Sequence, residues 1–333
     1  MVLSSASHDV SLVFPAGNRP TIGRGDRDTY VYYIVAPEFG GDEGENVTIT
    51  LYNTFGQYAT FEKPGVSLRH NRIALVSLSV EEWNGQVPPD PPSVDGMLPG
   101  TFSVSATQQV HFSQGNLQYQ ASTNTWRFAE HQYDFVGYAN SNISSTYSGW
   151  IDLFGWGTGN NPTLVSTTYT YYSTFVDWGS NAIINGGNAV NQWRTLTTSE
   201  WSYLLNSRTN ASSKRGTGNI NGVGGLIILP DSWTLPSWCP QFNPGFASNP
   251  DDWTRNSYTL AQWSQMEAAG AVFLPAAGLR YGTNVGNVGY SGYYWSSTPN
   301  NEIYVYSMDF YSNDLDATWG NSRDSGFSVR PVR

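Results

Sequence analysis

The sequence predicts a small all-β sandwich followed by a larger α+β domain, and three observations lead to this prediction. The chain has 333 residues, enough for about two domains that each bury a core. Its first segment holds short runs of β-branched and aromatic residues between turn-forming residues, with no helical period. Its later segment holds two stretches of helical periodicity among several strand-like runs, which is typical of an α+β domain.

The composition limits the classes of partner that the protein can be expected to bind. The chain carries 16 Lys and Arg against 26 Asp and Glu, a net charge of −10. Nucleic acids and anionic membranes bind clustered positive surfaces, so neither is an expected partner. Charged residues make up 13% of the chain and aromatic residues 15%, a mixture that excludes a disordered tail. We expect a sheet-rich protein whose surface contacts other molecules through rings and uncharged polar groups.

Cysteine chemistry and membrane insertion are not expected either. Cys239 is the only cysteine, so this chain forms neither an intrachain disulfide nor a Cys-based metal site. The four histidines do not lie at metal-ligand spacing. No run of about 18 apolar residues is present to span a membrane. No secretory leader precedes Ser4, so for an exported protein we expect the leader to be removed or absent from this chain.

Residues 1–84 are predicted to form the sandwich, and residues 85–98 a linker. Turns are predicted at Gly40-Gly41-Asp42 and Lys63-Pro64-Gly65, which contain turn-forming residues. The predicted strands are 10–14, 30–35, 47–52 and 73–80. The linker holds four prolines within residues 85–93. Proline removes a backbone donor and fixes φ, so this stretch favours a stiff extended spacer over a helix or a central strand.

The second domain, residues 99–333, is predicted to contain two helices. The first is capped by Thr198 or Ser199 and runs through Arg208, because apolar residues 201, 204 and 205 share one face. From Thr198, the glutamate comes too early for an ideal capping box. The second helix covers 259–269, with Thr259 as its cap and Gly270 as its C-terminal stop.

Strand-like runs and long loops complete the second domain. Loops 139–177 and 232–258 show little periodicity, and loops this long are usually functional or packed by their own side chains. The predicted strands are 101–106, 109–113, 225–229, 271–274, 292–297, 303–310 and 326–332.

Motifs spread over most of residues 100–333 carry a resemblance to a known family. They are Gly115-Asn-Leu-Gln-Tyr119, Trp126-Arg-Phe-Ala129, Gln132-Tyr-Asp134, Trp193-Arg-Thr-Leu-Thr197 with Glu200-Trp201, Phe273-Leu-Pro-Ala-Ala-Gly278, Gly292-Tyr-Tyr-Trp-Ser-Ser-Thr298 and Gly326-Phe-Ser-Val-Arg330. This region resembles the Fibrobacter succinogenes major paralogous domain of Bacteroidetes surface proteins. The resemblance implies a C-type-lectin-like fold, and within the family it is nearest to the variable proteins of diversity-generating retroelements. Those proteins display altered side chains on their C-terminal strands and loops.

The N-terminal segment resembles the C-terminal β-sandwich half of fimbrillin-like pilin proteins. The residues that carry this resemblance are Ser67-Leu-Arg-His-Asn-Arg-Ile73, followed by an alternating strand. The resemblance implies an extracellular, cell-surface or outer-membrane-associated protein with a pilus or surface-anchor partner.

The window 299–325 is the candidate binding segment. Of its 27 residues, 15 are Asn, Tyr, Ser or Asp. Adaptable binding surfaces use such residues, because Tyr gives contact area at low entropy cost and Asn and Ser give flexible hydrogen bonds. The alternative is a polar, solvent-facing hairpin without a ligand. The candidate binding residues are Asn300, Asn301, Tyr304, Tyr306, Asp309, Tyr311, Asn313, Asp314, Asp316, Trp319, Asn321 and Asp324, supported by loop 283–291.

Calcium is a second hypothesis for the same window. Pro299-Asn-Asn-Glu302 and Trp319-Gly-Asn321 partly match the loop and strand motifs of calcium-dependent lectins. Calcium needs six to eight oxygen ligands, and the candidate carboxylates are Glu302, Asp309, Asp314, Asp316 and Asp324. Neither motif is complete, so no cofactor is predicted, and a solvated acidic face remains the simpler interpretation.

Enzymatic motifs are incomplete, and we do not expect an enzyme. The related formylglycine-generating oxidases need two cysteines, whereas Cys239 is alone and fits a structural thiol. His131 and Asp134 suggest an acid–base pair, but no nucleophile motif accompanies them. Tyr290-Ser-Gly292 falls short of a hydrolase elbow. The glycine-rich stretches 216–218 and 222–225 lack phosphate-binding spacing and fit hairpin turns better.

The tryptophans divide into two predicted groups. Trp319 lies inside the candidate window and is the predicted exposed anchor, since Trp and Tyr dominate binding hot spots. The others lie in motifs or on helix faces and are assigned to the core. These core tryptophans are Trp126, Trp150, Trp156, Trp193, Trp201, Trp263 and Trp295.

Together these observations favour an adhesin-like protein that binds a protein or glycan non-covalently. The window 299–325 has a net charge of −4, so a neutral or basic partner is expected rather than an acidic one. The alternative is a structural pilus or surface-layer subunit that assembles only with its own copies.

Overall fold

The computed structural model describes the backbone of residues 2–5, 8–11, 45–52, 58–66, 95–235 and 241–333, and side chains within the last two ranges. The chain divides into two compact units, Met1–Pro88 and Pro89–Arg333. The division falls inside the segment where the linker is predicted. Several predictions lie outside the described residues: strands 30–35 and 73–80, the turn at 40–42, the motif 67–73, linker residues 85–94 and Cys239.

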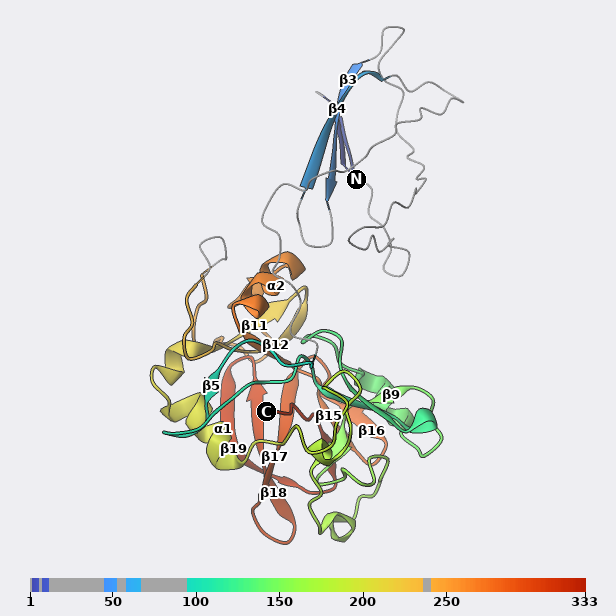
Figure 1. The fold of residues 1–333 in the computed structure, drawn as a ribbon, viewed down its shortest axis with the longest axis vertical. Helices are drawn as coiled ribbons and strands as arrows, with labels where there is room; N and C mark the ends of the chain where they lie inside the picture. The colour runs from blue at the N-terminus through green and yellow to red at the C-terminus, as the bar shows by residue number, and fades with distance from the viewer. Residues whose placement is uncertain (1, 6–7, 12–44, 53–57, 67–94, 236–240) are drawn as a thin grey trace. The chain divides into compact units, whose positions relative to one another are not determined.

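The described part of the first unit is an antiparallel sheet with the order β2-β1-β3-β4 (Figure 1). Its strands are β1 (Val2–Ser5), β2 (His8–Ser11), β3 (Glu45–Tyr52) and β4 (Tyr58–Val66). The turn predicted at residues 63–65 is wrong, because Pro64 and Gly65 lie inside β4. The pairing register shifts there, between Glu45 and Val47 of β3. Proline is tolerated at a bulge on an edge strand, where no neighbour needs its missing N–H. The sandwich itself stays a prediction.

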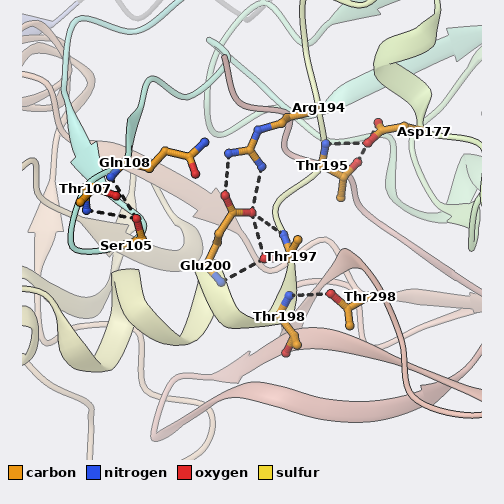
Figure 2. Close-up of polar contacts among 10 residues, drawn as sticks. All are labelled: Ser105, Thr107, Gln108, Asp177, Arg194, Thr195, Thr197, Thr198, Glu200 and Thr298. Atoms are coloured by element: carbon orange, nitrogen blue, oxygen red, sulfur yellow. Dashed lines mark hydrogen bonds and ion pairs between the residues drawn. The ribbon is translucent and has the colours of Figure 1, made fainter.

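The first helix of the second unit begins one residue earlier than predicted. Helix α1 (Thr198–Ser202) continues as a π-helical turn, η5 (Tyr203–Ser207). The Thr197 hydroxyl accepts a hydrogen bond from the Glu200 N–H at 3.2 Å, and the Glu200 carboxylate accepts one from the Thr197 N–H at 2.8 Å (Figure 2). This reciprocal pair is a complete capping box, with Glu200 at the required third helical position.

The second predicted helix is confirmed. Helix α2 (Leu260–Ala268) is capped by Thr259, whose hydroxyl accepts from the Gln262 N–H while the Gln262 side chain accepts from the Thr259 N–H. Gly270 follows with φ of +98°, a left-handed conformation that favours glycine and ends the helix. Trp263 and Met266 are the buried side of this helix.

Removing the cap of α1 is expected to destabilise the second unit. Thr197→Ala leaves the Glu200 N–H without its acceptor and should lower the free energy of unfolding by about 1 kcal/mol. The matched control is Thr168→Ala, since Thr168 precedes a 3₁₀ turn without a side-chain cap hydrogen bond. Urea denaturation of both variants measures the difference, and equal midpoints would show that the box does not stabilise the fold.

The described part of the second unit contains two four-stranded sheets and two short pairings, besides the sheet that carries the candidate segment. The order β13-β11-β12-β14 contains β11 (Arg215–Ile220), β12 (Val223–Ile228), β13 (Ser257–Tyr258) and β14 (Val272–Pro275). The order β10-β20-β15-β16 contains β10 (Phe154–Gly155), β15 (Leu279–Tyr281), β16 (Asn284–Gly286) and β20 (Ser325–Phe327). The short pairings are β5 (Phe102–Ser103) with β6 (Gln109–Val110), and β7 (Leu117–Gln120) between β8 (Thr125–Phe128) and β9 (Trp150–Ile151).

The third sheet, β17-β18-β19, carries the candidate segment near the C-terminus (Figure 1). Its strands are β17 (Ser291–Pro299), β18 (Tyr304–Tyr311) and β19 (Asp314–Ser322). The predictions for β12, β14, β17 and β18 are confirmed apart from their ends. Those for 101–106, 109–113 and 326–332 are too long, because pairing there covers two or three residues. The glycine stretches 216–218 and 222–225 lie mostly inside paired strands, and only the link between them is a turn.

Large aromatic side chains fill the core. Six of the seven tryptophans assigned to the core are no more than 5% exposed: Trp126, Trp156, Trp193, Trp201, Trp263 and Trp295. The assignment of Trp150 is wrong, because it is only half-buried and its ring lies under the Arg127 guanidinium at 3.8 Å. Trp178, which is fully buried, takes part in the core without having been predicted.

The fold is therefore mixed, with mostly β-sheet and few helices, as the α+β prediction states. Among the described residues, no helix combines the length and the apolar character that crossing a membrane requires.

Candidate functional site

The candidate residues lie along two antiparallel strands rather than in one loop. Tyr304 lies opposite Ser322 at one end of the β18–β19 pair, and Tyr311 lies opposite Asp314 at the other. Seven residues separate these ends on β18, a distance of about 23 Å. Strand β19, which was not among the predicted strands, forms the edge of the sheet. The predicted display window is therefore not one surface, because its residues lie on both faces and at both ends of the sheet.

A bulge in β19 decides which side chains share a face. Ser307 of β18 lies opposite Trp319. Asp309, two residues along β18, lies opposite Asp316, which is three residues from Trp319. β19 therefore holds one extra residue between these pairs. In a regular strand, residues three apart point to opposite faces, whereas this bulge places Asp316 and Trp319 on the same face.

Five of the candidate residues form one continuous row on that face, which we call the edge face. Trp319 is 55% exposed and is the largest exposed side chain of the row. Residues directly opposite one another in an antiparallel pair share a face, so the row can be read from the register. The edge face consists of Tyr311, Asp314, Asp316, Trp319 and Asn321, over a floor of Ser307 and Asp309.

The floor of the edge face is held by hydrogen bonds. The Ser307 hydroxyl donates to one carboxylate oxygen of Asp309 at 2.7 Å. The Asn321 amide donates to the other carboxylate oxygen of Asp309 at 2.8 Å, and also to Ser307 Oγ at 2.8 Å. Asp309 is 6% exposed, so its assignment to the display surface is corrected: it supports the surface from beneath. Asn321 links the floor to the exposed row.

Tyrosine rings extend the edge face toward loop 283–291. The hydroxyls of Tyr311 and Tyr293 lie 3.0 Å apart, and the Asn287 amide donates to Tyr293 at 3.2 Å. Tyr290 meets the Tyr311 ring edge-on, with centroids 5.6 Å apart, and is 37% exposed. Loop 283–291 thus contacts the candidate surface, and Tyr290 adds a residue that the candidate set did not contain.

The remaining candidate residues fall outside the edge face. Tyr304 and Tyr306 point to the opposite side of β18, together with Gly320 and Ser322 of β19. Asn301 serves the turn between β17 and β18, since its side-chain oxygen accepts from the N–H groups of residues 303 and 304. Asn300 is exposed at the same turn, and Asn313 is exposed at the turn between β18 and β19.

Asp324 is also corrected. It follows β19 and is 3% exposed, and its carboxylate accepts a hydrogen bond from the Ser322 hydroxyl. The composition of the window could not separate Asp324 and Asp309 from the exposed Asp314. The burial of Asp309 depends on its pairing within the β17–β18–β19 sheet, whereas that of Asp324 depends on its place in the turn between β19 and β20.

Helix α1 holds the bulge in place. Ala317, at the bulge, is 3% exposed in the main core cluster with Trp201 of α1. The Thr198 hydroxyl donates to the Ala317 carbonyl at 3.4 Å. The Thr198 N–H donates to the Thr298 hydroxyl of β17 at 3.1 Å, as Figure 2 shows. The first turn of α1 therefore contacts both β17 and β19.

A forked ion pair fixes that first turn. Arg194 donates to both carboxylate oxygens of Glu200, at 2.8 and 2.6 Å (Figure 2). Burial acts to raise the pKa of Glu200, but the hydrogen bonds and charge of Arg194 and the bonds from Thr197 outweigh it and lower the pKa. Asp177 anchors the segment before α1 by accepting hydrogen bonds from the N–H and hydroxyl of Thr195.

Burial raises the pKa of Asp309 to about 7. The negative charge of Asp316 also raises this pKa, whereas the hydrogen bonds from Ser307 and Asn321 act to lower it. This value lies above the ordinary value of 3.8, so the folded state holds the proton more tightly than the unfolded chain. The stability that Asp309 contributes is complete below about pH 4 and is lost as the pH rises through 7.

Asp309→Asn is therefore expected to stabilise the protein at high pH. The variant keeps the shape and cannot ionise, so its advantage over the wild type should grow between about pH 4 and pH 7, to on the order of 2–4 kcal/mol. Urea midpoints of both proteins at several pH values measure this advantage. Parallel pH profiles would contradict the buried position of the carboxylate.

The described residues form no cluster of ligands that would support the calcium hypothesis. In that part of the chain, no three His, Cys, Asp or Glu side chains come together in a way that could hold a metal ion. Asp309 and Asp324 are engaged in buried hydrogen bonds, and Asp316 accepts from the Thr318 N–H and hydroxyl at 2.7 and 3.0 Å.

His131 and Asp134 do form the contact that the sequence suggests, with Nδ1 3.0 Å from the carboxylate. The hydrogen bond with Asp134 raises the pKa of His131, although burial acts against it. Both side chains are well exposed, and the His131 ring stacks on Tyr133 at 5.0 Å. Within the described residues, the only side-chain hydrogen bond that His131 makes is the one to Asp134.

Comparison with known proteins adds one match. A family model described as a domain of unknown function, DUF8237, matches residues 254–332, which include α2 and the β17-β18-β19 sheet. No curated protein and no solved structure matches the chain.

Proposed function

We propose that this chain is an extracellular, cell-surface ligand-binding protein of the adhesin type, which binds a protein or glycan through the edge face. The observation that supports this most is the bulge of β19. It aligns Trp319 with Tyr311, Asp316 and Asn321 on one exposed face above a buried, hydrogen-bonded floor. An exposed Trp beside Tyr and Asn side chains has the composition of a binding hot spot with adaptable polar contacts.

The rigid support beneath the edge face favours binding. The floor bonds of Asp309 and the α1 contacts to the bulge hold the backbone before a ligand arrives. A preorganised surface loses less conformational entropy on binding, so more of its contact energy appears as affinity. Binding is proposed to be non-covalent, with no bond chemistry and no cofactor.

The charge of the edge face favours a neutral or basic partner. Asp314 and Asp316 lie in the row, and neither forms an ion pair with another described residue. An acidic ligand would bring like charges together at this face. A basic ligand would instead bind more weakly as salt increases.

The motif resemblances complete the proposal. We propose that the second unit has a C-type-lectin-like fold of the type found in variable proteins of diversity-generating retroelements. In such a protein, β18 and β19 would carry the varied positions. The first unit is a fimbrillin-like sandwich that joins a pilus or surface anchor. A near-copy template repeat beside a reverse transcriptase gene, 3′ of the coding sequence, would support the variable-protein part; a 3′ region without them would contradict it.

The alternative is a structural subunit of a pilus or surface layer. Its support is the edge position of β19, because an edge strand presents unpaired backbone groups to a second chain. Light scattering of the purified chain, together with a glycan and protein array, separates the two functions. The binder is expected to be a monomer that labels defined array positions. Filaments that label none would favour the subunit.

A further inference from the structure

A cavity of about 230 Å³ lies in the long loop between β10 and η4 (Trp178–Ser180). Two stretches of this loop, 156–164 and 171–176, supply its walls. None of these residues belongs to the edge face. The volume is several times the roughly 30 Å³ that one water molecule occupies in the liquid, so the cavity has room for an organic ligand.

The walls of the cavity are fixed by backbone bonds. The Gly159 N–H donates to the Val176 carbonyl, and the Val176 N–H donates to the Gly157 carbonyl, both at 3.0 Å. The Tyr172 hydroxyl accepts from the Ser166 N–H at 2.9 Å, and Trp156 Nε1 donates to the Ser296 carbonyl at 3.0 Å. The cavity is therefore preformed, as ligand pockets usually are.

The lining combines aromatic rings with uncharged polar groups. Trp156 and Tyr172 are no more than 2% exposed and form the inner wall, whereas Tyr171 is 69% exposed at the rim. Asn160, Asn161, Ser173 and Thr174 are exposed at the same rim. In the described part of the chain, the side chains of these four residues bond no other protein group, so their donors and acceptors face solvent or a ligand.

The chemistry of the lining selects the ligand class. None of the side chains that line the cavity is charged, and the nearby Arg323 guanidinium lies behind the wall, where it bonds backbone carbonyls, so a charged ligand would lose hydration without gaining a direct counter-charge. Rings accept an apolar face, and amides and hydroxyls both donate to and accept from ligand hydroxyl groups. We propose that this cavity binds a neutral monosaccharide unit, independently of the edge face.

Arg323 ties the cavity wall to the turn between β17 and β18. Its guanidinium lies 4.8 Å from the Trp156 ring and donates to the carbonyls of Tyr172 and Ser173, at 3.4 and 3.3 Å. It also donates to the carbonyl of Asn301. All three acceptors are backbone groups, so side-chain changes at the turn leave the wall of the cavity in place.

Saturation-transfer NMR on the full chain tests this site. The probes are glucose, galactose, fucose and N-acetylglucosamine, with the charged sugar N-acetylneuraminic acid for comparison. The expected result is transfer to at least one neutral sugar, falling about tenfold in a Tyr171→Ala, Asn161→Ala double variant. Both replaced residues are exposed, so the fold should tolerate the change.

Two control variants make the outcome specific. Tyr138→Ala removes a ring that is 65% exposed and does not line the cavity, and Trp319→Ala alters only the edge face. Transfer should be unchanged in both. The assignment is overturned if no neutral sugar receives saturation, if the signal survives in the double variant, if the charged sugar gives the stronger signal, or if Trp319→Ala removes it.

Discussion

Trp295→Ala is expected to lower the free energy of unfolding of the second unit by about 3–5 kcal/mol, the usual cost of removing a buried Trp. The Trp295 ring is 1% exposed and stacks on Phe327 with centroids 4.2 Å apart. Its indole N–H donates to the Phe154 carbonyl at 2.6 Å, so the variant also leaves that carbonyl without this donor. Thermal unfolding should show a melting temperature lower by roughly 10 °C.

Trp319→Ala is the matched control for this stability measurement. The same residue type is replaced 24 positions along the chain, but the Trp319 ring is 55% exposed. A surface substitution of this kind changes the free energy of unfolding by about 0.5 kcal/mol or less. Similar losses in the two variants would place Trp319 in the core and contradict the assignment of the edge face.

Trp319→Ala is expected to have the largest effect on ligand binding. Truncation of a hot-spot Trp typically costs about 2–4 kcal/mol of binding free energy, which corresponds to a rise in Kd of roughly 30- to 1000-fold. The ligand is whichever glycan or protein labels the array most strongly, titrated against the purified chain. Tyr138→Ala, which removes a ring that is 65% exposed and lies outside the edge face, should leave Kd unchanged.

Local patterns in the sequence predicted the helices well. Thr259 and Gln262 lie three residues apart before an apolar face, and both the cap and the Gly270 stop of α2 follow from that spacing. The start of α1 was misplaced by one residue because Thr197, Thr198 and Ser199 are all capping residue types. Only the bonds to Glu200 distinguish among them.

Features that depend on distant pairing could not be predicted. Trp126 and Trp150 both lie in aromatic-rich stretches, but only the tertiary packing buries the first and leaves the second half-exposed. Asp309 and Asp314 have the same chemistry, and the register of β18 against β17 and β19 separates the buried carboxylate from the exposed one.

A signal for β19 was present in the sequence. Leu315 and Ala317 alternate with polar residues directly after the turn at residues 312–313, a pattern typical of a half-buried strand. The bulge after Ala317 interrupts this alternation. The face on which Trp319 lies therefore requires the pairing with Ser307.

In the proposed function, one face of the β18–β19 pair, and not the whole C-terminal segment, binds the ligand. Binding of Trp319→Ala and Tyr304→Ala to the array ligand tests it most directly, because these two exposed rings lie on opposite faces near the same end of the sheet. We predict that Trp319→Ala loses at least about 30-fold in affinity while Tyr304→Ala stays within about twofold, with both melting temperatures unchanged. Loss of affinity in Tyr304→Ala alone, or retention in both variants, would contradict the claim.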